Sequence, residues 1–475
     1  NNYYRFHAAN SSVKTYVNRS YYEEHEAVAC EVAKLYDVPD KTLQGHRYFV
    51  ERFFLENASE MIAKGTRFDS LYDSSRIEAC RASRLPNLMI ASYAFSTGGG
   101  EVFPIRLAIG LKRLGYGVTF FNFNGAEVNE AMRKTLAPDI PVVELSGRFA
   151  GVDNTLENFG IEIVHTHHAS VDHFFAMGRL RSRDTISQVV TMHGMYEAMD
   201  PSTFRANVIR MAAKVDQWIY IADKNLLPFE EYGLYQDNRF SKIGNGMVRP
   251  QIEPASRDEF GIGEDAFVAC LASRALPEKG WREAIRMTGE ARRNTGRDIQ
   301  LVLLGDGPVY DALQAEQVPE YVHLPGFRQD AVNFYAMADA GILPTRFKGE
   351  SFPLTIIECF MAGNPVIATD VGEVRNMMTS DDGNVAGFVV GLEENGHIPV
   401  SEFAAHLASL ASDAVLYNEK RLLAEALAPR FEMSRVLDDY EGVYNAVIGA
   451  GAAQGASSSA EPASGDAQAA IRKSA

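Results

Sequence analysis

Two successive series of short apolar runs, each alternating with segments of helical pattern, constrain the fold of this chain most strongly. The first series comprises residues 88–92, 118–123, 161–164, 188–192 and 218–221, and the second comprises residues 267–271, 299–304, 341–343 and 365–368. Such alternation is typical of parallel sheets with helices on both faces. The sequence therefore predicts an α/β protein with two Rossmann-like, doubly wound domains in tandem. Their strand ends should face a shared cleft, where ligands of open α/β sheets bind.

Changes in pattern along the chain predict the domain boundaries. We expect a helical N-terminal extension at 1–85, the first α/β domain at 86–247, the second at 248–430, a C-terminal helix returning toward the first domain at 431–448, and a flexible tail at 449–475. Within the extension, Tyr21 to Tyr36 and Gly45 to Lys64 have amphipathic helical patterns. Residues 246–260 contain prolines without a clear period and are predicted to link the two domains. The first residue is Asn1 rather than Met, which together with the Ala/Gly/Ser-rich tail favours a piece of a larger polypeptide.

Charge and cysteine usage exclude several classes of protein. The net charge of -16 argues against a nucleic-acid partner, which requires a basic face. Peripheral contact with an anionic membrane stays open through a local basic patch, Arg205, Arg210 and Lys214, on one predicted helix. The four cysteines form no CxxC or Cys/His cluster, so we expect reduced thiols and no structural zinc. No signal peptide and no apolar run long enough for a membrane span is visible, which favours a cytoplasmic location.

The segment 349–358, Gly-Glu-Ser-Phe-Pro-Leu-Thr-Ile-Ile-Glu, carries the most informative chemistry. Pro353 suits the first turn of a helix, where its missing N–H costs little. The free N–H groups around Leu354 and Thr355 then form an anion site suited to a phosphate. Glu358 lies one turn further along and can reach ribose hydroxyls, whereas Glu350 precedes the helix and can bind sugar hydroxyls.

The spacing of these two glutamates is weak evidence when taken alone. Glu23 and Glu31 in the N-terminal extension have the same spacing, with no site around them. Two solvated surface glutamates would be the ordinary interpretation. The helix start between Glu350 and Glu358 is what favours a binding site.

Two cations and two glycine turns follow strands in the same way. Arg274 and Lys279 come after the strand at 267–273 and could hold a diphosphate, although a pair of surface charges is the commoner case. Gly305 lies in a tight turn that either lines a nucleotide pocket or only reverses the chain. Gly98 and Gly99 do not form a GxGxxG pattern. They would let the backbone approach a ligand closely, and a plain turn fits equally.

Histidines gather at 165, 167 and 168, with His193 after a later strand. No carboxylate or cysteine stands at a ligand spacing beside them, so we predict no metal site. His193 would face the cleft, where an imidazole can bond a sugar hydroxyl or a phosphate.

Taken in order, these elements resemble the GT-B glycosyltransferases, in particular the retaining family 4 (glycosyl transferases group 1). The resemblance runs from Leu88 to about Ile448, roughly three quarters of the chain. It rests on the glycine loop at 98–100, His193, Ile243-Gly244-Asn245-Gly246, Arg274 with Lys279, Leu304-Gly305-Asp306-Gly307-Pro308, His323-Leu324-Pro325-Gly326-Phe327, Glu350 to Glu358, and Met361-Ala362-Gly363-Asn364-Pro365-Val366-Ile367-Ala368-Thr369-Asp370-Val371-Gly372.

This resemblance implies metal-independent transfer of a sugar, with retention, from a nucleoside diphosphate sugar to a sugar, lipid-linked or glycan acceptor in polysaccharide or glycoconjugate synthesis. No cofactor is implied. The catalytic set would be Arg274, Lys279, Glu350 and His193, and the donor-binding set Gly98, Gly99, Gly305, Phe327, Phe352, Leu354, Thr355 and Glu358. The chain departs from the family pattern at two places. Pro353 stands where glycine is frequent, and Glu373 follows Val371-Gly372 where a second glycine is usual.

Three alternatives compete with this interpretation. A GT-B sugar-nucleotide epimerase is the main alternative among enzymes, although the cationic pair is less expected there. A non-catalytic GT-B module that binds sugar or scaffolds a larger protein is compatible with the extra N-terminal helices. A dehydrogenase is disfavoured, because GxGxxG is absent.

Overall fold

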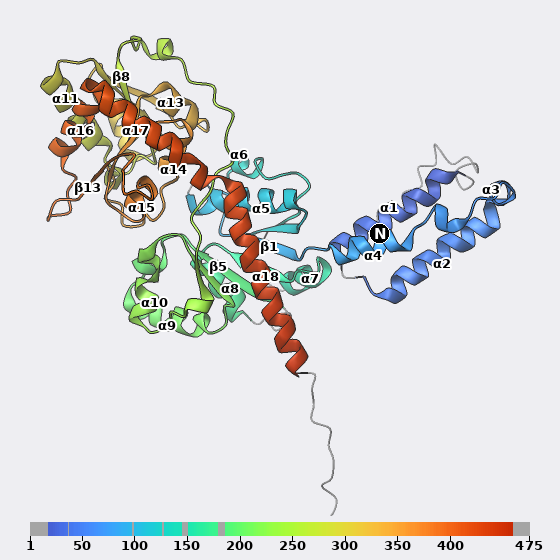
Figure 1. The fold of residues 1–475 in the computed structure, drawn as a ribbon. Coiled ribbons are helices and arrows are strands. Elements are labelled where there is room, and N and C mark those ends of the chain that lie inside the picture. The colour runs from blue at the N-terminus through green and yellow to red at the C-terminus, as the bar shows by residue number, and fades with distance from the viewer. Residues whose placement is uncertain are drawn as a thin grey trace, which may run out of the picture.

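The structure is a computed structural model that describes residues 18–36, 38–96, 99–125, 128–144, 151–178 and 186–458, with side chains up to 449. It confirms the predicted α/β architecture with two parallel sheets. Figure 1 shows these sheets in two separate lobes, with helices α1 to α4 standing away from both.

The first domain is built on a seven-stranded sheet in the order β3-β2-β1-β4-β5-β6-β7, and every pairing is parallel. Its strands are β1 (Asn87–Ser92), β2 (Gly117–Asn122), β3 (Val142–Glu144), β4 (Ile163–Thr166), β5 (Ser187–Met192), β6 (Gln217–Tyr220) and β7 (Phe240–Lys242). Its helices are α5 (Gly99–Leu114), α6 (Glu130–Arg133), α7 (Val152–Asn158), α8 (Ala169–Met177), α9 (Pro201–Ala212) and α10 (Leu227–Glu231). The sequence pattern placed Arg205, Arg210 and Lys214 on one helix. This is wrong for Lys214, because α9 ends at Ala212.

The second domain is built on a six-stranded parallel sheet in the order β10-β9-β8-β11-β12-β13. Its strands are β8 (Phe267–Ala272), β9 (Ile299–Leu304), β10 (Val322–Gly326), β11 (Ala340–Leu343), β12 (Val366–Thr369) and β13 (Gly387–Val390). Its helices are α11 (Trp281–Thr295), α12 (Pro308–Ala315), α13 (Ala331–Met337), α14 (Leu354–Met361), α15 (Val374–Met378), α16 (Val400–Ser412) and α17 (Ala414–Leu427). The central strands β11 and β12 are buried along their whole length, as a sheet covered on both faces requires.

The N-terminal extension is helical, as predicted, with its own small apolar core around Tyr22 and Phe54. Its helices are α1 (Arg19–Leu35), α2 (Asp40–Asn57), α3 (Ser59–Ala63) and α4 (Ser74–Ala82). The second predicted helix, Gly45 to Lys64, is wrong in extent, because α2 begins at Asp40 and is interrupted at Ala58. The interruption follows Asn57, whose side-chain amide donates to the carbonyl of Phe53 at 3.0 Å and so competes with continued helix.

The C-terminal helix α18 (Met433–Ser458) returns to the first domain, where Leu437, Tyr440 and Tyr444 join the core around α5. A Cβ at Gly110 of α5 would lie 2.7 Å from a methyl group of Leu437, so the glycine permits this close packing. The helix runs past its predicted end at residue 448 as far as Ser458, so residues 449–458 of the predicted flexible tail are helical. Residues 459–475 of the predicted flexible tail lie outside the described residues.

The two chain segments that pass between the domains pair with each other. The N–H of Met247 donates to the carbonyl of Phe431 at 2.8 Å, and the N–H of Met433 donates to the carbonyl of Met247 at 2.9 Å. Among the described helices, none combines the length and apolarity needed to cross a bilayer.

Candidate active site

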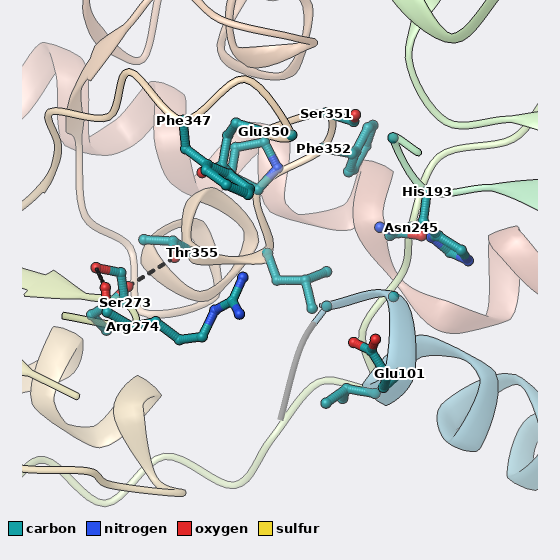
Figure 2. Close-up of a pocket in the computed structure, with 18 of the residues that line it drawn as sticks. Glu101, His193, Asn245, Ser273, Arg274, Phe347, Glu350, Ser351, Phe352 and Thr355 are labelled. Atoms are coloured by element: carbon teal, nitrogen blue, oxygen red, sulfur yellow. Dashed lines mark hydrogen bonds between the residues drawn. The ribbon is translucent and has the colours of Figure 1, made fainter. Parts of the chain in front are cut away.

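A pocket of about 460 Å³ opens between the two domains at the carboxyl ends of their strands. It receives residues from the turns after β1, β4 and β5 of the first domain, and after β8, β9 and β11 of the second. Its wall includes all but one of the predicted site residues: Gly99, His193, Arg274, Lys279, Gly305, Phe327, Glu350, Phe352, Leu354, Thr355 and Glu358. The exception is Gly98, which lies outside the described residues. Figure 2 shows the two walls, with Arg274, Glu350 and Thr355 on one side and Glu101 and His193 on the other.

The N-terminus of α14 forms the floor on the second-domain side. Pro353 is the N-cap residue rather than the first helical residue, so the helix starts one position later than predicted. The first intrahelical bond runs from the N–H of Ile356 to the carbonyl of Pro353, which leaves the N–H groups of Leu354 and Thr355 ahead of it. Thr355 Oγ1 donates to the carbonyl of Ala272 at 3.2 Å and ties this helix end to the end of β8. The positive end of the α14 dipole therefore faces the pocket, as an anion site requires.

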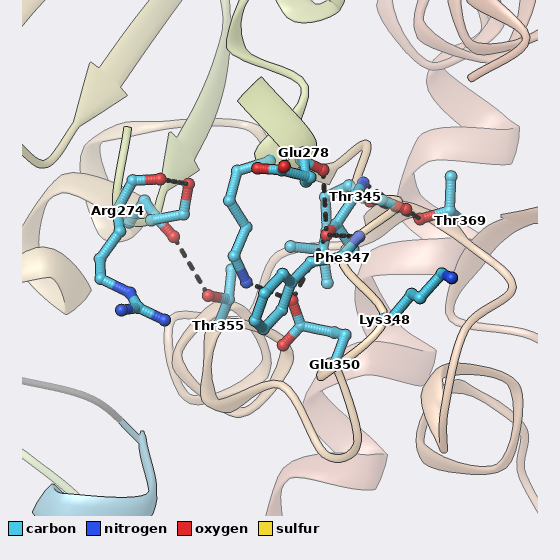
Figure 3. A network of polar contacts seen from close by, with 12 residues as sticks. Arg274, Glu278, Thr345, Phe347, Lys348, Glu350, Thr355 and Thr369 are labelled. Atoms are coloured by element: carbon cyan, nitrogen blue, oxygen red, sulfur yellow. Dashed lines mark hydrogen bonds and ion pairs between the residues drawn. The ribbon is translucent and has the colours of Figure 1, made fainter. Parts of the chain in front are cut away.

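Lys279 and Glu350 form an ion pair beside this helix end. The Lys279 ammonium also lies 4.7 Å from the centre of the Phe347 ring, and Thr345 Oγ1 donates to Glu350 Oε2 at 3.4 Å. Figure 3 shows this network of polar contacts beside the exposed side chain of Arg274. The sequence analysis assigned Lys279 to a diphosphate and Glu350 to sugar hydroxyls. In the structure, each of these side chains neutralises the charge of the other.

Arg274 is exposed in the pocket and has no ion pair with any described residue. Glu101, in the first turn of α5, lies across the pocket from it. Burial raises the pKa of Glu101, and the Arg274 charge acts in the opposite direction. Glu101 of the first domain and Arg274 of the second thus face the same space.

Arg106 and Glu358 face each other across the domain boundary deeper in the pocket. Burial raises the pKa of Glu358, and the charge of Arg106 acts against this effect. Nη1 of Arg106 is buried and has no hydrogen-bond partner among the described residues. Buried donors without partners are uncommon in folded proteins, and they often mark a place where a ligand or water completes the site.

His193 contacts a second histidine instead of standing alone. Its Nε2 lies 3.0 Å from Nδ1 of His167, and the two rings stack at 5.3 Å. Burial lowers the pKa of His193 to about 4 and that of His165 to about 3, so both are neutral at pH 7. Within the described ranges, no group of three or more His, Cys, Asp or Glu side chains is arranged to hold a metal ion.

Gly305, Phe327 and Phe352 line the pocket in different ways. Gly305 has φ of +141°, and a Cβ there would lie 2.0 Å from the carbonyl oxygen of Ser273, so only glycine fits the turn. Phe327 is 47% exposed at the pocket rim. Phe352 is less accessible, because its ring packs against Gly244. A Cβ added at Gly244 would lie 2.6 Å from this ring.

Sequence reasoning assigned no site role to Glu101, Arg106, His167 or Asn245, all of which line the pocket. Asn245 is 3% exposed, and its Oδ1 has no partner among the described residues. All four carried a signal, since Asn245 stands in the segment Ile243-Gly244-Asn245-Gly246 and His167 in the histidine cluster. Arg106 is a charge inside the apolar run Phe103 to Ala108, and Glu101 directly follows the glycine loop.

Comparisons with known proteins agree with this geometry. Residues 266–413 match the family model of glycosyl transferases group 1. Over 400 residues the chain is 25% identical to D-inositol 3-phosphate glycosyltransferase of Nocardia farcinica, a match that covers 74% of this chain and 85% of that protein. It is 27% identical to alpha-D-kanosaminyltransferase of Streptomyces kanamyceticus over 40% of this chain, which spans only 48% of that relative.

Among solved structures, Anabaena Alr3699/HepE in complex with UDP-glucose superposes with a TM-score of 0.63 at 18% identity. The match covers 76% of this chain and 99% of that one. This likeness shows the GT-B fold. The family model and the named relatives support a glycosyltransferase of group 1, an enzyme of the hexosyltransferase class.

Proposed function

We propose that the chain transfers a sugar from a nucleoside diphosphate sugar to an acceptor hydroxyl with retention of configuration, as a family 4 enzyme. One observation carries the proposal: a single pocket between the domains contains the N-terminus of α14, the unpaired Arg274 and the Lys279–Glu350 pair. A helix N-terminus and a guanidinium both bind phosphate oxygens, and carboxylates accept hydrogen bonds from sugar hydroxyls.

In this proposal the donor lies along the second-domain wall. The diphosphate sits between Arg274 and the N–H groups of Leu354 and Thr355. Glu350 binds hydroxyls of the donor sugar, and Glu358 binds the ribose. The base lies beside Gly305 and Phe327 at the rim.

The chemistry then depends on charge that develops on the leaving group. As the bond between the sugar and the diphosphate breaks, Arg274, Lys279 and the α14 dipole stabilise the growing negative charge. A leaving phosphate oxygen takes the proton of the acceptor hydroxyl as the new bond forms on the same face of the sugar. This route needs neither a protein nucleophile nor a metal ion. His193 and the backbone at Gly99 would border the donor sugar from the first domain.

The acceptor would approach from the first-domain wall, past Glu101 and His168. We propose a sugar, polyol, lipid-linked or glycan hydroxyl as acceptor, in the synthesis of a polysaccharide or glycoconjugate. The D-inositol 3-phosphate glycosyltransferase reported above supports a polyol acceptor through its name.

A donor panel tests the proposal. UDP, GDP and ADP are titrated by calorimetry, and the corresponding glucose and mannose donors are incubated with the enzyme while sugar release is followed. Binding of one nucleoside diphosphate, with turnover of its sugar conjugate, supports the transferase. Conversion of the donor to its epimer would favour the epimerase, and absence of binding and turnover with every donor would refute the proposal.

A further inference from the structure

Several polar contacts cross from the first domain to residues 348–351, the loop that carries Glu350. The Lys224 ammonium donates to the carbonyl of Lys348 at 2.7 Å. Asn225 Nδ2 lies 3.5 Å from Ser351 Oγ, and this hydroxyl donates to Glu197 Oε1 at 3.4 Å. Asn225 and Ser351 are both buried. The first domain therefore contacts the loop directly on one side.

Glu373, the N-cap residue of α15, makes two further crossings. Its side chain is 4% exposed, and both carboxylate oxygens have partners. Oε1 accepts from the backbone N–H of Asp223 at 2.7 Å, while Oε2 lies 3.0 Å from Lys242 Nζ. These two partners belong to the first domain, whereas a third, Asn376 Nδ2, donates to Oε2 at 2.8 Å from α15 itself. Moving the domains apart would leave the buried carboxylate with that amide alone and without the charge of Lys242.

Glu373 is also fixed to the loop of Glu350. Its backbone N–H donates to the carbonyl of Ser351 at 2.8 Å. At the neighbouring Gly372, a Cβ would lie 2.4 Å from the carbonyl oxygen of Ser351 and 2.6 Å from that of Glu350, so the two loops touch. A displacement of Glu373 must therefore displace the backbone of Glu350 and Ser351.

We propose that Glu373 is a positioning residue that seats the Glu350 loop against the first domain and so aligns the donor sugar with the acceptor wall. This inference rests on the proposed function. The nucleotide half of the donor would contact Arg274, Leu354 and Thr355, none of which takes part in these crossings. Glu373 therefore acts on the sugar and its transfer, and leaves nucleotide binding to the second domain alone.

The position of the loop can be tested without any ligand. Hydrogen–deuterium exchange is followed in peptides covering residues 346–353 and 220–226 of the wild type, Glu373→Ala, Lys242→Met and a control, Glu316→Ala. The control removes an exposed ion pair with Arg282, 2.6 Å long, elsewhere on the second domain. We expect exchange in both peptides to become about fivefold faster in Glu373→Ala and Lys242→Met, and to be unchanged in the control.

Function is read in the same variants with UDP and UDP-glucose as probes. We expect the Kd for UDP to stay within about twofold, while kcat for release of glucose falls by at least about tenfold. A merely structural role would instead weaken UDP binding in parallel with thermal stability. Unchanged exchange together with unchanged turnover in a folded Glu373→Ala protein would overturn the proposal.

Two further outcomes keep the inference separate from the proposed function. If Glu373→Ala does not fold, Lys242→Met removes one of its two cross-domain contacts, the ion pair, from the first-domain side and decides the question. If the wild type neither binds UDP nor releases glucose, the transferase proposal loses this donor. The exchange measurement still decides whether Glu373 holds the Glu350 loop against the first domain.

Discussion

Lys279 and Glu350 neutralise each other inside the pocket, with side chains that are only 11% and 12% exposed. Removal of one partner from such a buried pair leaves the other charge without compensation. Stability and catalysis should therefore respond differently to single and double substitutions.

We expect Lys279→Met and Glu350→Gln to lower the free energy of unfolding unequally. Lys279→Met leaves an ionised Glu350 in a buried site and should cost about 3 kcal/mol. The double variant should recover most of this loss, yet its transfer rate should stay at least about a hundredfold below wild type. Urea unfolding and donor turnover measure the two effects, and a double variant with wild-type turnover would refute the assigned roles.

Arg106 should control nucleotide affinity through Glu358. Without the Arg106 charge, burial acts on Glu358 unopposed and its pKa rises further, so a larger fraction of Glu358 is protonated at a given pH. We expect Arg106→Met to weaken nucleotide binding by about tenfold, with the defect growing as the pH falls from 8 to 6. Calorimetry across this range measures it, with the exposed Arg282→Met as control. A pH-independent loss would indicate packing rather than charge.

The histidines that line or adjoin the pocket should make the fold sensitive to mild acid. Burial lowers the pKa of His165 to about 3 and those of His168 and His193 to about 4, below the unfolded value of 6.5. Each contributes stability that is present above pH 6.5 and lost as the pH falls toward 4, because only the unfolded chain takes up the proton in that window. Urea unfolding at pH 7, 6 and 5 should show a steady decline. His165→Gln should flatten it, and an equally steep decline in this variant would exclude His165 as a source.

Gly305 should be irreplaceable for steric reasons beyond its backbone angle. Gly305→Ala places a methyl group against the Ser273 carbonyl, whereas Gly396, with φ of +76°, has open space around its Cβ position. Gly396→Ala therefore reports the cost of a positive φ without a steric clash, about 1 kcal/mol. We expect Gly305→Ala to cost at least about 2 kcal/mol more and to weaken nucleotide binding. Equal melting temperatures for the two variants would contradict this.

The sheets show where sequence patterns suffice and where they do not. Every central strand was predicted, because strands buried on both faces are continuous apolar runs. The four that were missed, β3, β7, β10 and β13, are the edge strands of the two sheets. These are three to five residues long and only partly buried, so they lack the apolar signature.

The candidate site divides in the same way. Residues in turns after predicted strands, such as Arg274 and His193, were found because such turns meet at one sheet edge. The pairings of Lys279 with Glu350 and of Arg106 with Glu358 were not predicted, since the paired residues are distant in sequence. Glu373 was noted only as a departure from a pattern, and its contacts with Asp223 and Lys242 come from the other domain.

The return of α18 to the first domain has a consequence for the order in which the chain can fold. Met433, Leu437 and Tyr444 complete an apolar core that otherwise belongs to residues 88–243. The second domain is thus an insertion between two parts of the first. On the ribosome, the second domain can finish folding as soon as it emerges, while the first must wait for the last helix. A nascent or truncated chain that stops before Met433 would expose the face of α5 that this helix covers, and would be a natural target for chaperones.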